Sequence, residues 1–530
     1  MTFRFRLVSP YARLAPRPPI RPLVFKHIAS NWSRNLLQIL VMLVLSPLMV
    51  EKLGEGGNGI WIAIIAATGF LELLALGVPM ASVRHISEAV NSGDAERTNR
   101  MVATGYAVTI GLGVVGGVIG LILYFPFEIG LVENENWSST PEDVLSAARC
   151  AYIITAVRVA AALSLRFPTA VFDSHHDFLT KNLIQNAGIL FRAIAVVIVL
   201  YTNPSLVSIA WIFVVEALLV FAAFRIFIKR RFTQVDFSLK HFDRSLVKEI
   251  LSFGIFAAIL NVGTMIAYSI DGLVVGGWIG NEAITDFDLG NKFFTPLAAI
   301  MYGIGAVVMP TATRLNIGDS RSALPDVFLK WSKVALSVVL PVGLYLTVLG
   351  PRFIAAWVDP QFESTSGLVT RILAPSFILS LPIRAVALPI LLGITQPARP
   401  ALIYLGFALL NLGLSIALVN MGYGIAGVAI GTALPQFLFA IYLLLVTCAE
   451  LELKPIRWIK YVGGRALIGS LPCVAFLLWM ERGLDVRSFP ALIAAGVGML
   501  AIYSCTWIFF VYRGDRFLDL TEEVRLRLRK

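Results

Sequence analysis

Residues 182–228, NLIQNAGILFRAIAVVIVLYTNPSLVSIAWIFVVEALLVFAAFRIFI, contain two apolar runs separated by a short polar break at Thr202-Asn203-Pro204. Each run supplies about the 20 apolar residues that an α-helix needs to cross the hydrocarbon core of a bilayer. Similar runs follow one another along most of the chain. Apolar residues make up 57% of the sequence and charged residues 15%, a balance that a soluble protein of this length could not expose to water without aggregating. The sequence therefore predicts an all-α polytopic membrane protein with about 14 transmembrane helices.

The net charge of +11 would suggest a nucleic-acid partner in a soluble protein. Here the Lys and Arg residues lie between the apolar runs, where they act as topology signals, so no nucleic acid is expected. The four cysteines, Cys150, Cys448, Cys473 and Cys505, lie in or beside apolar segments without CxxC spacing and are interpreted as packing residues. Neither a metal site nor a cofactor is predicted.

Basic residues recur in every second connection if the predicted helices alternate in direction. By the positive-inside rule these connections face the cytoplasm, so both termini are expected on the cytoplasmic side of a bacterial inner membrane. The connection at 127–143 is instead acidic, with Glu128, Glu133, Glu135, Glu142 and Asp143, and is predicted to lie outside. The basic N-terminal segment is expected to rest on anionic membrane lipids.

If the chain is divided at the basic connection near 229–247, its two halves share a pattern of residues. The first half carries Gly77-Val78-Pro79, Arg84 and Gly93-Asp94, and the second half carries Met309-Pro310, Arg314 and Gly318-Asp319 at the equivalent place. Weak internal symmetry of this kind is typical of transporters, which rock one repeat against the other around a midplane site. The pattern predicts two six-helix lobes related by a pseudo-two-fold axis around a central cavity, with two extra C-terminal helices.

The predicted division of the chain follows from these spans and connections. It comprises residues 1–33 as a cytoplasmic basic tail, 34–228 as the N-lobe, 229–247 as a basic cytoplasmic linker, 248–447 as the C-lobe, 448–512 as the two extra helices, and 513–530 as a cytoplasmic tail.

Residues 53–94, LGEGGNGIWIAIIAATGFLELLALGVPMASVRHISEAVNSGD, resemble the second-helix signature of polysaccharide transporters in the MOP flippase superfamily. The resemblance continues within 251–319, in FGIFAAILNVGTMIAYSIDGLVVGGWIG and LGNKFFTPLAAIMYGIGAVVMPTATR, where that family has an Asp at the position of Asp271. The sequence departs from the family's LDLG-like turn, because Ala75 stands where the acid would fall and Glu72 lies one turn earlier.

The resemblance implies two lobes flanking a central cavity and no enzymatic activity. The implied cargo is a polyprenyl-diphosphate-linked oligosaccharide, flipped from the cytoplasmic to the outer leaflet for O-antigen, capsule or exopolysaccharide export. A polysaccharide polymerase and glycosyltransferases are then the expected partners. Two alternatives in the same superfamily are a cation-coupled multidrug exporter and a lipid II flippase. A membrane polymerase or glycosyltransferase is less favoured, because the longest outer loop has under about 20 residues, which is within the range of simple connections.

A transporter for a diphosphate-linked lipid needs cations in its cavity, because an anion that leaves water must be paired. Arg158, Arg192 and Arg384 lie deep in predicted spans, too far from the helix ends for easy contact with water, and are the first candidates for binding the cargo. Arg84 and Arg314 lie near cytoplasmic helix ends, where a long side chain reaches water, but the repeat places both at the inner mouth of the cavity.

Four further charges fall inside predicted spans and are interpreted as coupling or structural charges. Glu72 and Glu216 are acids of the first lobe, and Asp271 and Lys292 are opposite charges on consecutive helices of the second. Because a buried charge needs a partner whatever its function, Asp271 and Lys292 are expected to pair with each other.

Overall fold

The computed structural model describes residues 20–75, 77–252, 255–317, 321–395 and 398–519, and every regular element within them is helical. The first half of the chain contains α1 (Ile20–Gly69), α2 (Val78–Ser92), α3 (Ala95–Ile122), α4 (Tyr124–Phe127), α5 (Glu142–Leu165), α6 (Pro168–Ser174), α7 (Phe178–Thr202) and α8 (Leu206–Arg231). The second half contains α9 (Arg244–Ser252), α10 (Ile255–Ser269), α11 (Asp271–Trp278), α12 (Asn281–Asn291), α13 (Phe294–Ile317), α14 (Leu324–Trp357), α15 (Thr365–Ile394), α16 (Ala398–Leu418), α17 (Gly424–Glu450), α18 (Pro455–Trp458), α19 (Arg465–Leu478) and α20 (Phe489–Thr506). The all-α prediction is confirmed.

Within the described residues, eleven helical segments are long and apolar enough to cross a membrane, or twelve if the bent pair 259–269 and 271–278 forms one span. Two of these segments, Ser33–Ser92 and Arg399–Glu450, contain 60 and 52 residues, more than twice the roughly 20 that one crossing requires. Each contains a glycine with positive φ, a conformation open to glycine because it lacks a Cβ atom. Gly54 (φ 73°) interrupts α1, and Gly422 (φ 90°) lies between α16 and α17. The count of 14 spans stays a prediction.

Some predicted domain boundaries differ from the ends of the helices. Helix α1 begins at Ile20, inside the segment predicted as a tail, and residues 1–19 of that segment lie outside the described residues. The predicted linker at 229–247 overlaps the end of α8 and the start of α9. Of the predicted C-terminal tail, residues 520–530 also lie outside the described part.

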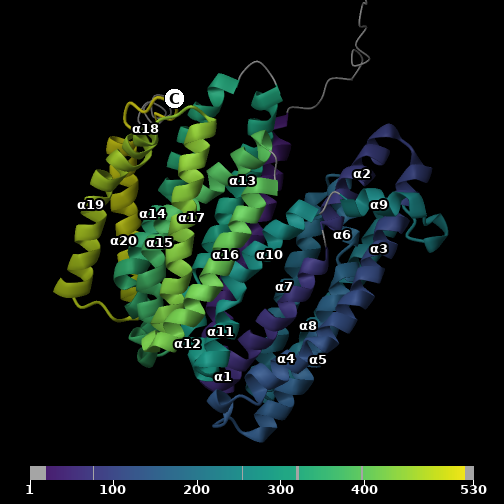
Figure 1. The fold of residues 1–530 in the computed structure, drawn as a ribbon, viewed down its shortest axis with the longest axis horizontal. Helices are drawn as coiled ribbons and strands as arrows, with labels where there is room; N and C mark the ends of the chain where they lie inside the picture. The colour runs from purple at the N-terminus through teal and green to yellow at the C-terminus, as the bar shows by residue number, and fades with distance from the viewer. Residues whose placement is uncertain (1–19, 76, 253–254, 318–320, 396–397, 520–530) are drawn as a thin grey trace, which may run out of the picture.

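The helices gather into two groups that approach each other at one end of the molecule and diverge toward the other (Figure 1). Helices α2–α8 form one group and α13–α20 the other, and α1 packs against α5 and α7 of the first group and against α12. The divergent end carries α2, α9 and α18, which flank the basic connections (Figure 1). The pseudo-two-fold relation between the two lobes stays a prediction.

A set of hydrogen bonds joins the first group to the connection between α11 and α12, at the end opposite the basic connections. The Trp137 indole N–H donates to the Gly276 carbonyl at 2.9 Å, and the amides of Asn134 and Asn136 both donate to the Gly277 carbonyl at 3.0 Å. In addition, the Asn281 amide donates to Thr140 Oγ1 at 2.9 Å. Trp137 is fully buried in this contact. We call this contact, between residues 134–140 and 276–281, the closed end.

Helices α19 and α20 are anchored to α14 by a buried ion pair. The Lys333 ammonium donates to Asp515 and to the Val511 carbonyl, and the two side chains of the pair are only 3% and 2% exposed. The Tyr461 hydroxyl donates to both oxygens of the same carboxylate, at 2.8 and 2.9 Å. Burial raises the pKa of Asp515, but the hydrogen bonds from Lys333, the Phe517 backbone N–H and Tyr461 outweigh it and hold the pKa below its ordinary value.

Replacing Asp515 with Asn is expected to lower the free energy of unfolding by about 3–5 kcal/mol, because it leaves the buried Lys333 charge without a partner. Since the pKa of Asp515 is depressed in the folded state, the carboxylate stabilises the fold above the ordinary Asp pKa of about 3.9, and this contribution is lost as the pH falls through the lower folded value. Unfolding of the detergent-solubilised variant by denaturant at several pH values measures both effects.

The matched control is Asp326→Asn, which removes an ion pair with Arg516 whose side chains are 34% and 63% exposed. An exposed pair contributes only about 0–1 kcal/mol. Equal destabilisation by the two variants would contradict the role assigned to Asp515.

Candidate functional site

A cavity of about 920 Å³ lies between the two helix groups, bounded by α1, α5, α10, α11 and α12. Its charged lining residues are Glu72, Arg158, Asp271 and Asp288. A neighbouring pocket shares Tyr268, Asp288 and Asn291 with it. These shared residues make the two pockets adjoining parts of one space, which we call the central cavity.

A second pocket, of about 1060 Å³, adjoins the central cavity through Arg158 and is lined by α1, α5, α7 and α8. Four arginines line this pocket, and Glu216 is the one acid among its lining residues; the arginines are Arg34, Arg158, Arg166 and Arg192. We call it the cationic pocket. The structure therefore brings two of the predicted cargo-binding residues, Arg158 and Arg192, into one site.

The arginines of the cationic pocket differ in how far their charge is neutralised. Arg192 pairs with Glu216 at 3.2 Å, and Arg166 pairs with Glu72 at 3.0 Å. Arg158 has no Asp or Glu of the described residues within salt-bridge distance, and its buried Nε has no hydrogen-bond acceptor there. The positive charge of Arg158 therefore remains available to an anionic ligand.

Arg34 is not among the cargo-binding residues predicted from the sequence, where it is the first residue of the predicted N-lobe, next to the basic tail. Its guanidinium donates to Gln185 Oε1 at 2.9 Å, so this hydrogen bond leaves its charge unneutralised. A basic residue at the cytoplasmic end of a span is ordinarily explained by contact with water, and only the packing of α1 against α7 reveals that Arg34 faces the same pocket as Arg158.

The stem of Arg158 also borders an apolar groove on the outer surface of α5 and α8. The groove has a volume of about 640 Å³, and Arg158 is the one charged residue that lines it. Exposed apolar side chains line the groove, including Val157, Trp211 and Leu218 at 52%, 54% and 52% exposure. Arg158 thus lies where a lipid-facing groove, the cationic pocket and the central cavity meet.

Arg384 lies apart from the cationic pocket, inside the second helix group. It is 7% exposed and donates to the hydroxyls of Tyr268 and Tyr302 at 2.9 and 3.3 Å. Its guanidinium carbon lies 4.4 Å from the centre of the Tyr404 ring. Because Tyr268 lines the central cavity and Arg384 is absent from that lining, the structure places Arg384 behind the cavity wall, away from the surface where it was predicted.

The predicted Asp271–Lys292 pair is wrong. Asp271 is 1% exposed and accepts a hydrogen bond from Thr432 Oγ1 at 2.8 Å. Lys292 instead pairs with Asp288, four residues earlier. Asp288 lies one helical turn before Lys292, so the two side chains meet without a bend of the backbone. Asp271 instead lies at the start of α11, after the break that separates α11 from α10.

Arg84 and Arg314 both lie near helix ends at the divergent end of the molecule. Arg84 is exposed and pairs with Glu88 at 3.2 Å, and Arg314 is an exposed residue in the last turn of α13. Both positions agree with side chains that reach water. Their predicted contact with cargo at the mouth of the cavity stays a prediction.

The fold is similar to that of solved membrane transporters. The structure of the lipid II flippase MurJ in an inward closed conformation matches 91% of this chain and 98% of its own, with a TM-score of 0.64 and 16% identity. The inward-facing structure of a multidrug resistance MATE family transporter of the MOP superfamily matches 78% of this chain and 98% of its own, with a TM-score of 0.59 and 15% identity. The architecture is that of the MOP superfamily.

The family model described as polysaccharide biosynthesis protein matches residues 24–316, more than half of the chain. The chain therefore belongs to this family, and it has the fold of the solved MOP-superfamily transporters. A relative in Bacillus subtilis (strain 168), the uncharacterized membrane protein EpsK, is 21% identical over 487 residues, which cover 90% of this chain and 93% of that protein. The family expected from residues 53–94 and 251–319 is confirmed.

Proposed function

We propose that this protein flips a polyprenyl-diphosphate-linked oligosaccharide from the cytoplasmic to the outer leaflet of a bacterial inner membrane, for the export of a surface polysaccharide. The observation that carries the proposal is Arg158, a deep cation whose charge no described acid neutralises, in a pocket lined by three further arginines. Charge-assisted hydrogen bonds from guanidinium groups suit the oxygens of a diphosphate. The sugars of the head group would then occupy the rest of the central cavity.

Arg158 lies where a polar surface and an apolar surface meet, which favours an amphipathic cargo. The cationic pocket and the central cavity offer polar walls to a diphosphate and its sugars. The groove between α5 and α8 offers an apolar wall that faces lipid. A polyprenyl tail in this groove would stay in hydrocarbon while its diphosphate contacts Arg158, so the head group crosses the membrane and the tail does not leave it.

Alternating access supplies the proposed transport cycle. By the positive-inside rule, the divergent end with its basic connections faces the cytoplasm, and the closed end faces outward. The state described here is then the one that loads cargo from the cytoplasmic leaflet. Rocking of the two lobes would break the contact of residues 134–140 with residues 276–281 and release the cargo outside.

The charge of the pocket separates this proposal from a cation-coupled multidrug exporter. Glu216 and Glu72 pair with Arg192 and Arg166, which leaves Arg34 and Arg158 without an acidic partner among the described residues. These two cations disfavour a cationic drug, because like charges repel in a desolvated site. A lipid II flippase has a cargo of the same chemical class and is separated by experiment. Transport places the protein upstream of a polysaccharide polymerase and downstream of glycosyltransferases, which we propose as its functional partners.

Reconstitution of the purified protein into liposomes tests the proposal. The liposomes contain a fluorescent polyprenyl-diphosphate oligosaccharide, and an impermeant reductant bleaches the fluorophore on the outer leaflet. With the protein present, the bleached fraction is expected to rise from about half of the lipid to nearly all of it, because only flipped molecules reach the outer surface. Lipid II and a cationic dye serve as competing substrates. Faster transport of the cationic dye than of the lipid would overturn the proposal.

A further inference from the structure

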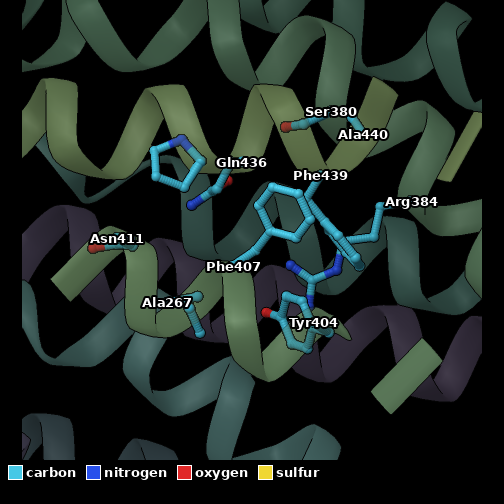
Figure 2. Close-up of a pocket in the computed structure, with 11 residues that line it drawn as sticks. Ala267, Ser380, Arg384, Tyr404, Phe407, Asn411, Gln436, Phe439 and Ala440 are labelled. Atoms are coloured by element: carbon cyan, nitrogen blue, oxygen red, sulfur yellow. The ribbon is translucent and has the colours of Figure 1, made fainter. Parts of the chain in front are cut away.

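Another, smaller cavity lies inside the second helix group, surrounded by α10, α15, α16 and α17 (Figure 2). Only about 20 Å³ of it can be reached by the centre of a water-sized sphere, and every residue that lines it except Phe407 is buried. Arg384, Tyr404 and Gln436 enter it from α15, α16 and α17, respectively (Figure 2). None of its charged or polar lining residues lines the cationic pocket, so this cavity is a separate place in the fold.

The charge on Arg384 has no counter-charge in this cavity. No Asp or Glu in the described part of the chain lies within salt-bridge distance of its guanidinium. Three tyrosine rings surround it, with centres 4.4 to 5.8 Å from the guanidinium carbon, and two of their hydroxyls accept its hydrogen bonds. Aromatic faces and hydroxyls attract a cation but leave its net charge in place, and an unpaired buried charge is costly.

Several hydrogen-bond donors of the cavity also lack an acceptor. Arg384 Nε, Gln436 Nε2 and Asn411 Nδ2 are buried and have no partner among the residues that the structure describes. Ser380 Oγ is unpartnered as well. The Asn411 carbonyl oxygen accepts from Ser415 Oγ at 3.5 Å, so the NH₂ end of this amide remains free. The unsatisfied atoms are thus a cation and neutral donors around one small space.

We propose that this cavity binds a small inorganic anion of halide size, held by Arg384 with Gln436 and Asn411. An anion supplies both the missing negative charge and an acceptor for several donors at once. A water molecule would accept hydrogen bonds but would leave the Arg384 charge unpaired. The lipid-linked cargo does not fit, because the cavity is lined almost entirely by buried side chains and has room for only a water-sized ligand.

The site is coupled to the transport pathway through a single side chain. Tyr268 accepts from Arg384 at 2.9 Å and also lines the central cavity. An anion that holds the guanidinium in place therefore holds the Tyr268 ring in the cavity wall. Loss of the anion frees Arg384 to move toward a negatively charged cargo in the central cavity.

Equilibrium dialysis with radioactive chloride tests the proposal on the purified full-length protein in detergent, with gluconate keeping the ionic strength constant. We expect about one chloride per chain, because the cavity contains one uncompensated cation. The Arg384→Gln variant is expected to lose this binding. Gln436→Leu keeps the Arg384 charge and replaces the amide with a side chain of similar volume. It is expected to weaken chloride binding by roughly tenfold or more, the effect of losing one charge-assisted hydrogen bond. Because Gln436→Leu leaves the ion's principal partner intact, it keeps the test informative if Arg384→Gln fails to fold.

The control is Arg158→Gln, which removes the uncompensated charge of the cationic pocket and should leave chloride bound. Loss of chloride in Arg158→Gln together with full binding in Arg384→Gln would assign the ion to the cationic pocket and overturn the proposal. Absence of stoichiometric chloride in the wild-type protein would show that the cavity holds water only. Either result leaves the proposed flipping of lipid-linked oligosaccharide untouched, because that function rests on Arg158.

Discussion

Replacing Arg158 with Gln is expected to reduce transport of the lipid-linked oligosaccharide by roughly 10- to 100-fold, because a hydrogen bond to a charged group contributes about 1.5–3 kcal/mol. The guanidinium of Arg158 has no acidic partner among the described residues, so its charge is free to pair with the diphosphate. The fraction of fluorescent lipid flipped in liposomes per unit time measures the effect. In cells, surface polysaccharide should fall while the protein remains in the membrane.

Two variants define what the Arg158 result means. Arg158→Lys keeps the charge but removes the forked geometry that suits a diphosphate, so it should recover part of the activity. Arg352→Gln removes an arginine of α14 that pairs with Asp485 at 2.7 Å, far along the chain from the pocket, and should transport normally. Normal transport by Arg158→Gln would show that the cationic-pocket mechanism is wrong.

Replacing Gly59 with Ala is expected to disrupt the closed end and shift the protein toward the outward-open state. A Cβ atom at Gly59 would lie 1.8 Å from the backbone carbonyl oxygen of Asn281, so a backbone segment must move. Overpacking of this kind costs about 1–3 kcal/mol, which corresponds to a change of roughly 5- to 150-fold in the equilibrium between the two states. The variant should therefore expose the contact between residues 134–140 and 276–281 to the outside.

Modification of a Thr140→Cys reporter by an impermeant maleimide measures this exposure, in a background that lacks the exposed thiols Cys150 and Cys505. Gly57→Ala is the matched control, because a Cβ there meets only the Leu53 side chain, at 3.2 Å. Labelling should accelerate in Gly59→Ala and not in Gly57→Ala. The same slow labelling in both variants would mean that the closed end tolerates the extra methyl group and that the lobes do not separate there.

The cationic pocket shows how far local sequence reasoning reaches toward a site. Depth within an apolar run identified Arg158 and Arg192, because an arginine far from a helix end needs a polar neighbour inside the protein. The same criterion chose Arg384, which the structure places in a tyrosine cage behind the cavity wall. Depth reports distance from water along one helix, whereas the direction in which a side chain points depends on which helices surround it.

Charge pairing was predictable only where the partner is close in sequence. Lys292 pairs with Asp288 one turn earlier, a contact that helical spacing would have indicated, although the sequence interpretation favoured Asp271. Arg166 pairs with Glu72 and Lys333 pairs with Asp515, across large separations in the chain. Such pairs form only after helices from different parts of the sequence have packed together.

The apolar run at 182–228 alone determined that this chain crosses a membrane, because hydrocarbon accepts only segments whose backbone hydrogen bonds are satisfied internally. The succession of such runs also predicted that the chain crosses the membrane many times. Tertiary structure decided which charges meet, where the chain closes between residues 134–140 and 276–281, and that Arg158 remains uncompensated. The physical reason is that hydrophobic length is a property of one segment, while the neutralisation of a buried charge depends on every helix that packs around it.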